Sequence, residues 1–416
     1  MVRFLHTADW QIGMTRRWLP AEAQARYAAA RVEAVRRIGE VAAEQDCEFV
    51  VVCGDVFETN QLSRQTVRRT LEALADVPVP VYLLPGNHDP LDAATIYRSD
   101  TFLKYCPAHV VVLDGAGPVT VREGVELVAA PWGSKHPDAD LVGQALATVG
   151  PADGTVRIVV GHGAVDLLDP DRHNRAGIAL APVEEALAAG RIHYVALGDR
   201  HSRTDVGGSG AVWYSGTPEV TDPREQAPGD VLVVTVGDGS PPRVDPHQVG
   251  TWSFRSLERE ITCAADVEAL DRELSALPSR DRTVVRVSLR GALGLADHAR
   301  LEEMLAGHGE VLAALHTWER HHHVAVIADD EDLGDLGWGG FVAAAAEEIR
   351  GLGGAAGAGA AAVADVDPEA ARDTTDEIAD GDDLAGWHHE TEREWDGQSA
   401  QDALALLYRL STQGAR

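Results

Sequence analysis

The chain has 416 residues, of which 36 are basic and 66 acidic, so its formal net charge is −30. A charge of this sign and size excludes a protein that binds nucleic acid through bulk electrostatic attraction, and any contact with DNA must be local. The length allows two or three domains with substantial hydrophobic cores.

Cysteine usage and the distribution of apolar residues indicate a cytoplasmic protein. The four cysteines lie far apart and form no CxxC pair, which argues against a disulfide framework and against a zinc cage. A predicted strand begins at Val2, without the charged segment and the long apolar stretch of a signal peptide. No apolar run approaches the length of a membrane span. We therefore expect reduced thiols and no association with a membrane.

In chain order, the first ninety residues alternate between β-strands and α-helices. We predict strands at about 2–6, 49–52 and 79–84, separated by helices at about 21–45 and 63–76. Such alternation favours a mainly parallel sheet with covered faces. A helix is then predicted at about 94–105, followed by strands at about 109–113, 119–122, 125–130, 156–160, 193–197, 211–214 and 230–236. These elements complete a first domain of residues 1–248.

Five of the predicted strands end on side chains that can bind a metal or a phosphate. They are Asp9, Asp55, the run Asn87-His88-Asp89, His162, and the pair Asp199 and His201. Taken singly, such an aspartate is more often a helix cap or turn former, and such a histidine an ordinary polar residue. The set is informative because chance would have to place ligand types at the same end of five strands. Carboxyl ends of parallel strands share one edge of a sheet, so we predict a common site there.

The residue types in this set suit metal-assisted hydrolysis at phosphorus. Two cations about 3.5–4 Å apart can clamp the attacking and leaving oxygens and make hydroxide available near neutral pH. A bridging carboxylate is needed to hold the cations so close together. The sequence therefore predicts a site for two divalent metal ions.

The ordered motifs resemble those of the calcineurin-like metallophosphoesterases, whose pattern reads D-x-H, G-D, G-N-H-D, G-H and G-H-x-H. More narrowly, four segments are similar to the nuclease subunits of bacterial SbcCD DNA-repair complexes, namely His6–Trp10, Gly54–Thr59, Tyr194–Gly198 and Tyr214–Pro218. The resemblance covers residues 1 to about 240. It implies an α/β fold in which a β-sheet sandwich is flanked by helices, with a small α+β cap domain that helps to grip DNA.

The resemblance also implies a role for each residue of the site. One metal would be held by Asp9, Gln11, Asp55 and His201, and the other by Asp55, Asn87, His162 and Asp199, with Asp55 as the bridge. His88 would face the scissile phosphate and protonate or stabilise the leaving oxygen. Asp89 would orient the His88 ring.

Two positions depart from the family pattern. Gln11 stands where a histidine is expected, and Asp199 stands where the first histidine of G-H-x-H belongs. Amide and carboxylate oxygens suit hard cations, so the exchange favours Mn²⁺, with Mg²⁺ as the alternative. A neutral amide is also a poor donor, which leaves open that Gln11 does not bind metal and that the protein is an inactive relic.

The remainder of the chain differs in pattern from the first domain. Residues 249–350 read as a small α+β unit, the predicted cap, with strands at about 252–260, 283–290 and 313–327 and helices at about 264–277 and 297–306. Residues 351–398 are first rich in glycine and alanine and then acidic, which predicts a flexible linker. Within 399–416, one amphipathic helix is predicted, with an apolar face of Ala403, Leu406, Leu407 and Leu410.

A helix this short must bury its apolar face against a partner surface. Docking onto the chain's own cap is one alternative, and docking into a groove of another protein is the other. The long connector favours the second. The resemblance implies that this partner is an SbcC-like coiled-coil ATPase, and it leaves a homodimer open.

Two further features have alternative interpretations. The run His321-His322-His323 is typical of a metal-binding tract, but it lies in an alternating β-like segment, and we expect an ordinary strand face. Arg16, Arg17 and Trp18 either contact DNA phosphates and bases or form a solvated loop.

The function that accounts for these features is a Mn²⁺-dependent DNA exonuclease and endonuclease in DNA repair, the nuclease subunit of an SbcCD-like complex. Two alternatives stay open. One is a phosphodiesterase or phosphatase for small molecules, against which the cap and the tail argue. The other is a catalytically weakened subunit that binds DNA ends.

Overall fold

The structure is a computed structural model that describes residues 1–171, 173–237, 239, 241–318 and 322–327. The chain forms two compact units. The first comprises residues 1–256, 279–285 and 312–314, and the second comprises the described parts of 257–278, 286–311 and 315–416. The predicted linker at 351–398 and the predicted helix at 399–416 lie outside the described residues. Among those that are described, no helix is both long and apolar enough to cross a membrane.

The first unit contains two six-stranded sheets. One has the order β12-β11-β1-β2-β3-β4, in which β1 to β4 are parallel and β11 and β12 are antiparallel to their neighbours. The bounds are β1 Val2–Thr7, β2 Val50–Cys53, β3 Val81–Leu84, β4 Val110–Val112, β11 Asp230–Val236 and β12 Arg243–Gln248. Leu5 pairs with Val50 on one side and with Val233 on the other, so the carboxyl ends of β1 and β2 lie next to each other.

The second sheet has the order β5-β6-β7-β8-β10-β9. Its four middle strands are parallel, and β5 and β9 are antiparallel strands at the two edges. The bounds are β5 Gly117–Arg122, β6 Val125–Ala129, β7 Val156–His162, β8 Tyr194–Gly198, β9 Thr204–Val206 and β10 Val212–Tyr214. The parallel arrangement that the sequence predicts for the first ninety residues is confirmed, because β1, β2 and β3 pair in parallel within the first sheet. Each of the two sheets also has antiparallel members.

The two sheets pack face to face across an apolar core. Phe4 and Phe49 of the first sheet stack at a centroid distance of 5.2 Å, and Phe4 meets Tyr194 of the second sheet edge-on at 5.6 Å. Leu127 and Ile158 of the second sheet belong to the same cluster and are fully buried. The central strands are therefore buried on both faces, as in parallel sheets whose outer faces are covered by helices.

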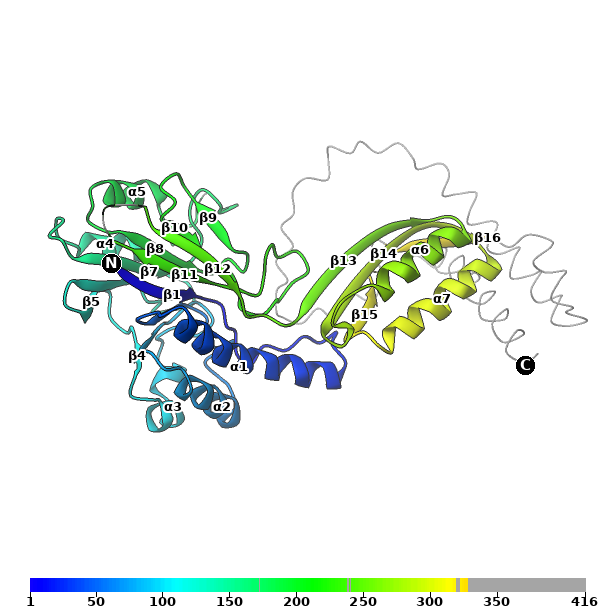
Figure 1. The fold of residues 1–416 in the computed structure, drawn as a ribbon, viewed down its shortest axis with the longest axis horizontal. Helices are drawn as coiled ribbons and strands as arrows, with labels where there is room; N and C mark the ends of the chain where they lie inside the picture. Colours follow the sequence, from blue (N-terminus) through cyan, green and yellow to red (C-terminus); the bar gives the residue numbers. More distant parts are fainter. Residues whose placement is uncertain (172, 238, 240, 319–321, 328–416) are drawn as a thin grey trace, which may run out of the picture. The chain divides into compact units, whose positions relative to one another are not determined.

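Helices cover the outer faces of both sheets (Figure 1). On the first sheet, Val35, Ile38 and Leu71 pack with strand residues in one cluster. These helices are α1 Ala21–Glu44, α2 Arg64–Ala75 and α3 Asp100–Tyr105, preceded by the 3₁₀ turn Ile96–Arg98. On the second sheet the helices are α4 Leu141–Ala147 and α5 Leu180–Ala188. The predicted fold class is confirmed, because the unit is a β-sheet sandwich flanked by helices.

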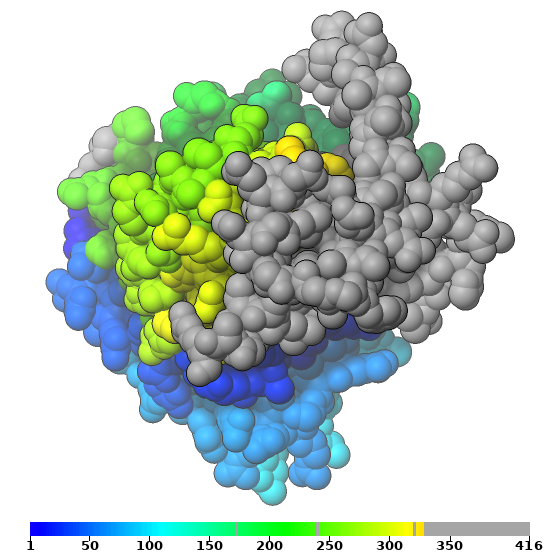
Figure 2. Space-filling model, turned by 90° about the vertical axis from the view of Figure 1, so that its right-hand side faces the viewer, coloured from blue at the N-terminus to red at the C-terminus, as the bar shows by residue number. Residues whose placement is uncertain are grey.

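The second unit holds most of a smaller α+β arrangement. Its sheet has the order β13-β14-β15, and β16 pairs with β14 in parallel. The elements are β13 Ser253–Ile261, α6 Ala264–Ser275, the 3₁₀ turn Arg280–Arg282, β14 Thr283–Gly294, α7 Leu295–Gly309, β15 Ala314–Thr317 and β16 His323–Ile327. Part of α7, coloured yellow, is visible at the surface in Figure 2. Glu303 and Ala306 of this helix are exposed.

Two histidines of the predicted His321–His323 run are described: His322 precedes strand β16, and His323 is its first residue. The Nδ1 atom of His322 accepts a hydrogen bond from the backbone of Leu289 at 3.4 Å. His323 begins β16 and is exposed. His321 lies outside the described residues. The expectation of a strand face therefore holds for His323.

Candidate metal centre

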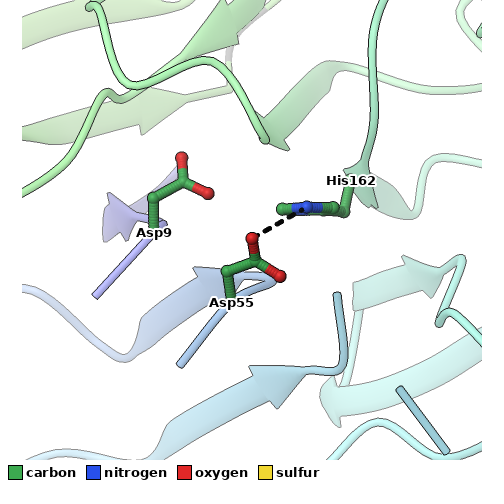
Figure 3. A group of neighbouring side chains, drawn as sticks. All are labelled: Asp9, Asp55 and His162. Carbon is green, nitrogen blue, oxygen red and sulfur yellow. Dashed lines mark ion pairs between the residues drawn. The ribbon is translucent and has the colours of Figure 1, made fainter. Parts of the chain in front are cut away.

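The strand ends of both sheets in the first unit converge on one group of side chains. Asp9 follows β1, Asp55 follows β2, and His162 ends β7 of the opposite sheet. One ligand atom from each of these three residues lies within 4.8 Å of the other two, and all three residues are buried (Figure 3). The predicted common site at the carboxyl edge thus draws on both sheets.

The backbone at the carboxylates has an unusual conformation. Asp9, Gln11, Asp55 and Asp199 have positive φ angles of 53°, 42°, 54° and 96°. Such conformations cost about 1–3 kcal/mol each for residues other than glycine, and they persist where surrounding contacts impose them. Here the two strand-end loops bind each other, because Asp9 N donates to Gly54 O at 3.1 Å and Gln11 N donates to Asp55 O at 2.8 Å.

Glycines in the motifs are required by close approach of neighbouring groups. A Cβ atom on Gly54 would lie 2.1 Å from the His162 ring, and one on Gly86 would lie 2.2 Å from the Asp55 carboxylate. A Cβ atom on Gly198 would lie 1.9 Å from the carbonyl oxygen of Cys53. The glycines before Asp55, Asn87 and Asp199 therefore permit the ligand side chains to pack closely.

His162 is oriented by its own backbone contact. Its Nδ1 donates to Cys53 O at 2.8 Å, which directs Nε2 toward the centre of the site. Nε2 lies 2.7 Å from Asn87 Oδ1, 3.5 Å from Asp55 Oδ2 and 3.7 Å from Asp199 Oδ1. All four residues predicted for the second metal are thus brought together.

The carboxylates of Asp9, Asp55 and Asp199 lie close to one another, and their surroundings change their pKa values. Burial raises the pKa of Asp9 to about 6, although His201 and His162 oppose that shift. Burial also raises the pKa of Asp199. At Asp55 burial acts in the same direction, but His162 and His88 outweigh it and lower the pKa to about 2. Burial lowers the pKa of His162, but the carboxylates of Asp55 and Asp199 outweigh it and hold the value well above its usual range.

Gln11 and His201 meet at the side of the site predicted for the first metal. Gln11 Nε2 lies 3.1 Å from His201 Nε2. Gln11 Oε1 is buried and has no hydrogen-bond partner among the residues that the structure describes. A half-turn of the amide exchanges these two atoms. A buried amide oxygen without a donor, next to crowded carboxylates, fits a position beside a divalent cation.

His201 also has partners that the sequence does not predict. Its Nδ1 lies 2.7 Å from Thr221 Oγ1 and 3.1 Å from Glu225 Oε1. Burial lowers the pKa of His201, but the hydrogen bond to Glu225 and the charge of Asp9 outweigh it and raise the value to about 9. Thr221 and Glu225 lie in a loop without a ligand motif, so no pattern in the sequence identifies them.

His88 lies at the open side of the group, with about a third of its side chain exposed. Its backbone N donates to Asp55 Oδ1 at 3.0 Å. Its Nδ1 is 3.0 Å from Glu58 O, and its Nε2 is 4.0 Å from Asp55 Oδ2. The ring is therefore fixed by the carbonyl of Glu58, with Nε2 beside the bridging carboxylate.

The predicted role of Asp89 as the partner of the His88 ring is wrong. The Asp89 carboxylate is fully buried and accepts hydrogen bonds from Gly86 N at 2.8 Å, Phe57 N at 3.0 Å and the Tyr97 hydroxyl at 2.6 Å. The carbonyl of Glu58, at 3.0 Å from His88 Nδ1, takes the place of the expected carboxylate as the partner of the ring. Asp89 thus fastens the loop that carries Asn87 and His88 to the loop after β2.

Comparison with known families agrees with this geometry, since residues 2–203 match the model of the calcineurin-like phosphoesterase family. We call residues 2–203 the phosphoesterase domain, after the family that they match. Members of this family are hydrolases that use divalent metals, and Asp9, Asp55 and His162 of the domain form a group able to hold such an ion.

Three relatives are similar to parts of the chain. The D subunit of the nuclease SbcCD from Rhodobacter capsulatus is 31% identical over 122 residues, 28% of this chain and 28% of its own. Its counterpart from Bacillus subtilis is 26% identical over 151 residues, 35% of this chain and 32% of its own. The DNA double-strand break repair protein Mre11 from Archaeoglobus fulgidus is 32% identical over 91 residues, 21% of this chain and 19% of its own. The chain thus spans a third or less of the length of these relatives.

Two solved structures also match parts of the chain. A protein from Thermus thermophilus matches with a TM-score of 0.37 and 11% identity, over 60% of this chain and 99% of its own. A dimetal phosphatase from Danio rerio matches with a TM-score of 0.35 and 12% identity, over 58% of this chain and 98% of its own.

The loop of the phosphoesterase domain that carries Arg16 and Trp18 is anchored at several points. Arg16 N donates to Gln24 Oε1 at 2.7 Å, and the Trp18 ring meets Phe254 edge-on at 5.4 Å. Trp18 remains 39% exposed. Part of its ring therefore serves packing, and the expected DNA contact of this loop stays a prediction.

Restoring an imidazole at position 11 of the phosphoesterase domain is expected to tighten metal binding. In Gln11→His, the weaker of two binding events should strengthen at least about tenfold for Zn²⁺, because imidazole suits this ion better than an amide does. Titration of the metal-free protein with Zn²⁺ and Mn²⁺ measures the change. Gln61→His, at an exposed position, is the matched control. Equal titrations of the wild type and Gln11→His would show that position 11 does not face the metal.

Proposed function

We propose that the protein is a divalent-metal-dependent DNA nuclease that hydrolyses phosphodiester bonds as an exonuclease and endonuclease in DNA repair, with Mn²⁺ as the native metal. The observation that carries the proposal is the convergence of Asp9, Asp55 and His162 from two sheets. Gln11 Oε1, which has no hydrogen-bond partner within the described part of the chain, supports it from the side of the first metal. The relatives named as SbcCD nuclease subunits and as Mre11 support DNA as the substrate.

Seven residues of the site would bind metal, and one, His88, would transfer a proton. Asp55 would be shared, with Asp9, Gln11 and His201 on one side and Asn87, His162 and Asp199 on the other. Two divalent cations held this way supply Lewis acidity and make hydroxide available near neutral pH. The donor set, in which oxygens outnumber imidazoles, suits Mn²⁺ or Mg²⁺ better than Zn²⁺.

His88 would act on the leaving group. With Nδ1 donating to the carbonyl of Glu58, Nε2 is free to carry a second proton toward the site. As the P–O bond to the leaving alcohol breaks, that proton would pass from Nε2 to the alcohol oxygen. The exposure of the ring allows a phosphate of a long chain to reach it.

The experiment that tests the function compares two substrates. Purified protein is incubated with end-labelled duplex DNA and with a chromogenic phosphodiester, each with Mn²⁺, Mg²⁺ or Zn²⁺. Cleavage of DNA that is fastest with Mn²⁺ is the expected result. Hydrolysis of the chromogenic ester without cleavage of DNA would favour a small-molecule phosphodiesterase. Metal binding without any hydrolysis would favour a subunit that only binds DNA ends.

For the domains, we propose catalysis in residues 1–248, DNA contact by a cap of residues 249–350, a linker of residues 351–398 and a partner-binding helix in residues 399–416. The proposed partner of the helix is an SbcC-like coiled-coil ATPase. Support comes from the apolar spacing of Leu406 and Leu410 and from the relatives named as SbcCD subunits.

Removing the C-terminal segment should separate catalysis from assembly. Truncation after Ala385, or Leu406→Asp with Leu410→Asp, should leave metal-dependent hydrolysis unchanged and abolish co-purification with an SbcC-like ATPase, because the apolar face of the helix is lost. Affinity co-purification measures binding, and hydrolysis of the chromogenic ester is the control for folding. Full retention of the ATPase by both variants would contradict the proposed partner site.

A further inference from the structure

The His201 side chain is held on the face away from the metal centre by two residues of the loop between β10 and β11. Thr221 and Glu225 follow His201 by 20 and 24 residues, and both contact its Nδ1 atom. The Thr221 hydroxyl donates to the same Glu225 oxygen, and Thr221 N donates to the other oxygen, Oε2, at 2.9 Å. Glu225 is thus fixed by its own loop, and only 6% of its side chain is exposed.

These contacts determine which nitrogen of His201 faces the site. An ionised carboxylate can only accept a hydrogen bond, so Nδ1 carries a proton, and it donates to Glu225 and to the oxygen of Thr221. The opposite nitrogen, Nε2, points toward Gln11, 3.1 Å from the amide. In the neutral ring this leaves the lone pair on Nε2, the atom that faces Gln11.

We propose that Glu225, together with Thr221, is a positioning residue of the metal centre, which fixes the His201 ring so that Nε2 is presented to the first metal. The inference rests on the proposed function only in taking this site to bind a divalent cation. A carboxylate behind a metal-binding histidine fixes the tautomer and the ring plane and raises the basicity of the other nitrogen.

The departure at position 11 makes this support more important. Because Gln11 contributes an amide, His201 is the sole imidazole among the four ligands proposed for the first metal. His162, the imidazole proposed for the second metal, has a backbone carbonyl behind it, that of Cys53 at 2.8 Å. The two proposed metal sites therefore differ in the group that accepts a hydrogen bond from Nδ1 of the histidine ligand. Loss of Glu225 should lower the metal affinity of the first site and leave that of the second unchanged.

The test measures metal binding by the full-length protein and the hydrogen bond itself. In Glu225→Gln, calorimetric titration with Mn²⁺ should show the affinity of one of two binding events reduced about 10- to 100-fold, with the other unchanged. In metal-free protein with ¹⁵N-labelled histidine, the Nδ1 proton of His201 should resonate further upfield in Glu225→Gln than in the wild type, since a neutral acceptor makes a weaker hydrogen bond. His201→Gln assigns that resonance.

Glu126→Gln is the matched control, because it makes the same chemical change at a carboxylate that pairs with Arg157 on the second sheet. It should leave both affinities and the His201 resonance unchanged. Glu225→Ala is included because the glutamine side chain of Glu225→Gln can still accept the hydrogen bond from His201, whereas alanine cannot. Two unchanged affinities in both Glu225 variants, with two metals bound by the wild type, would overturn the role of Glu225. A wild type that binds no metal would overturn the proposed function as well.

Discussion

Replacing Asp55 by asparagine or alanine is expected to abolish metal binding and phosphodiester cleavage together. The Asp55 carboxylate lies next to the His88 backbone and the His162 ring at once, at distances of 3.0 Å and 3.5 Å. Both proposed cations lose a shared ligand when it is removed. A loss of about 4 kcal/mol in transition-state stabilisation corresponds to about 10³-fold in kcat/KM, and we expect at least that.

Two measurements separate this expectation from simple unfolding. Elemental analysis after dialysis and thermal unfolding of the metal-free protein should show little bound metal and a folded chain in Asp55→Asn. Because His162 and His88 lower the pKa of Asp55 to about 2, the ionised carboxylate stabilises the metal-free fold, and the variant should remain folded but unfold at a somewhat lower temperature. Asp76→Asn, at an exposed pair with Arg36, is the control. Retention of both metals by Asp55→Asn would rule out the bridging role.

The positions of the ligands are predictable from sequence because each follows a short apolar run. Val50–Cys53 and Val81–Leu84 are strands in the structure, and each is followed by a glycine motif and then by Asp55 or Asn87. The hydrophobic periodicity and the composition of a strand are local properties of the sequence. In a parallel sheet the carboxyl ends of the strands lie at one edge. The candidate ligands can therefore be identified from the sequence, because each lies only a few residues after the strand that positions it.

The pairing of strands is less predictable, since it depends on contacts remote in sequence. Nothing local distinguishes Val156–His162, in the second sheet, from Val50–Cys53, in the first, so the sequence does not tell which strands belong to which sheet of the predicted sandwich. The helices Leu141–Ala147 and Leu180–Ala188 are also not predicted, because with 7 and 9 residues they show few turns of apolar periodicity.

Side chains that support the ligands are the least predictable part of the site. Asp89 stands next to His88 in sequence, yet its carboxylate accepts from Phe57 and Tyr97 on other segments. Glu225 contacts His201 across a loop that has no motif. Adjacent residues can point in opposite directions, so neighbourhood in sequence says little about which polar groups meet. These roles follow from the three-dimensional arrangement alone.

Replacing His88 by asparagine is expected to leave both metals bound and to reduce kcat about 10²- to 10⁴-fold, the usual contribution of a positioned general acid. His88 touches Asp55 through its backbone N at 3.0 Å, a contact that any residue at this position retains. The ring Nε2, at 4.0 Å from Asp55, is not among the proposed metal ligands. Protonation of the leaving group should therefore be lost, while both metals remain bound.

The leaving group decides whether His88 acts as an acid. An ester with a good leaving group, such as a nitrophenolate, needs no proton, so His88→Asn should be impaired far less on that substrate than on DNA, whose alkoxide leaves poorly. Calorimetric titration with Mn²⁺ should match the wild type, and His247→Asn on the edge strand β12 serves as the matched control. Equal losses on both substrates would assign His88 to binding of the phosphate, because binding acts on both esters alike. A fall in metal affinity equal to that of Asp55→Asn would instead make His88 part of the metal centre.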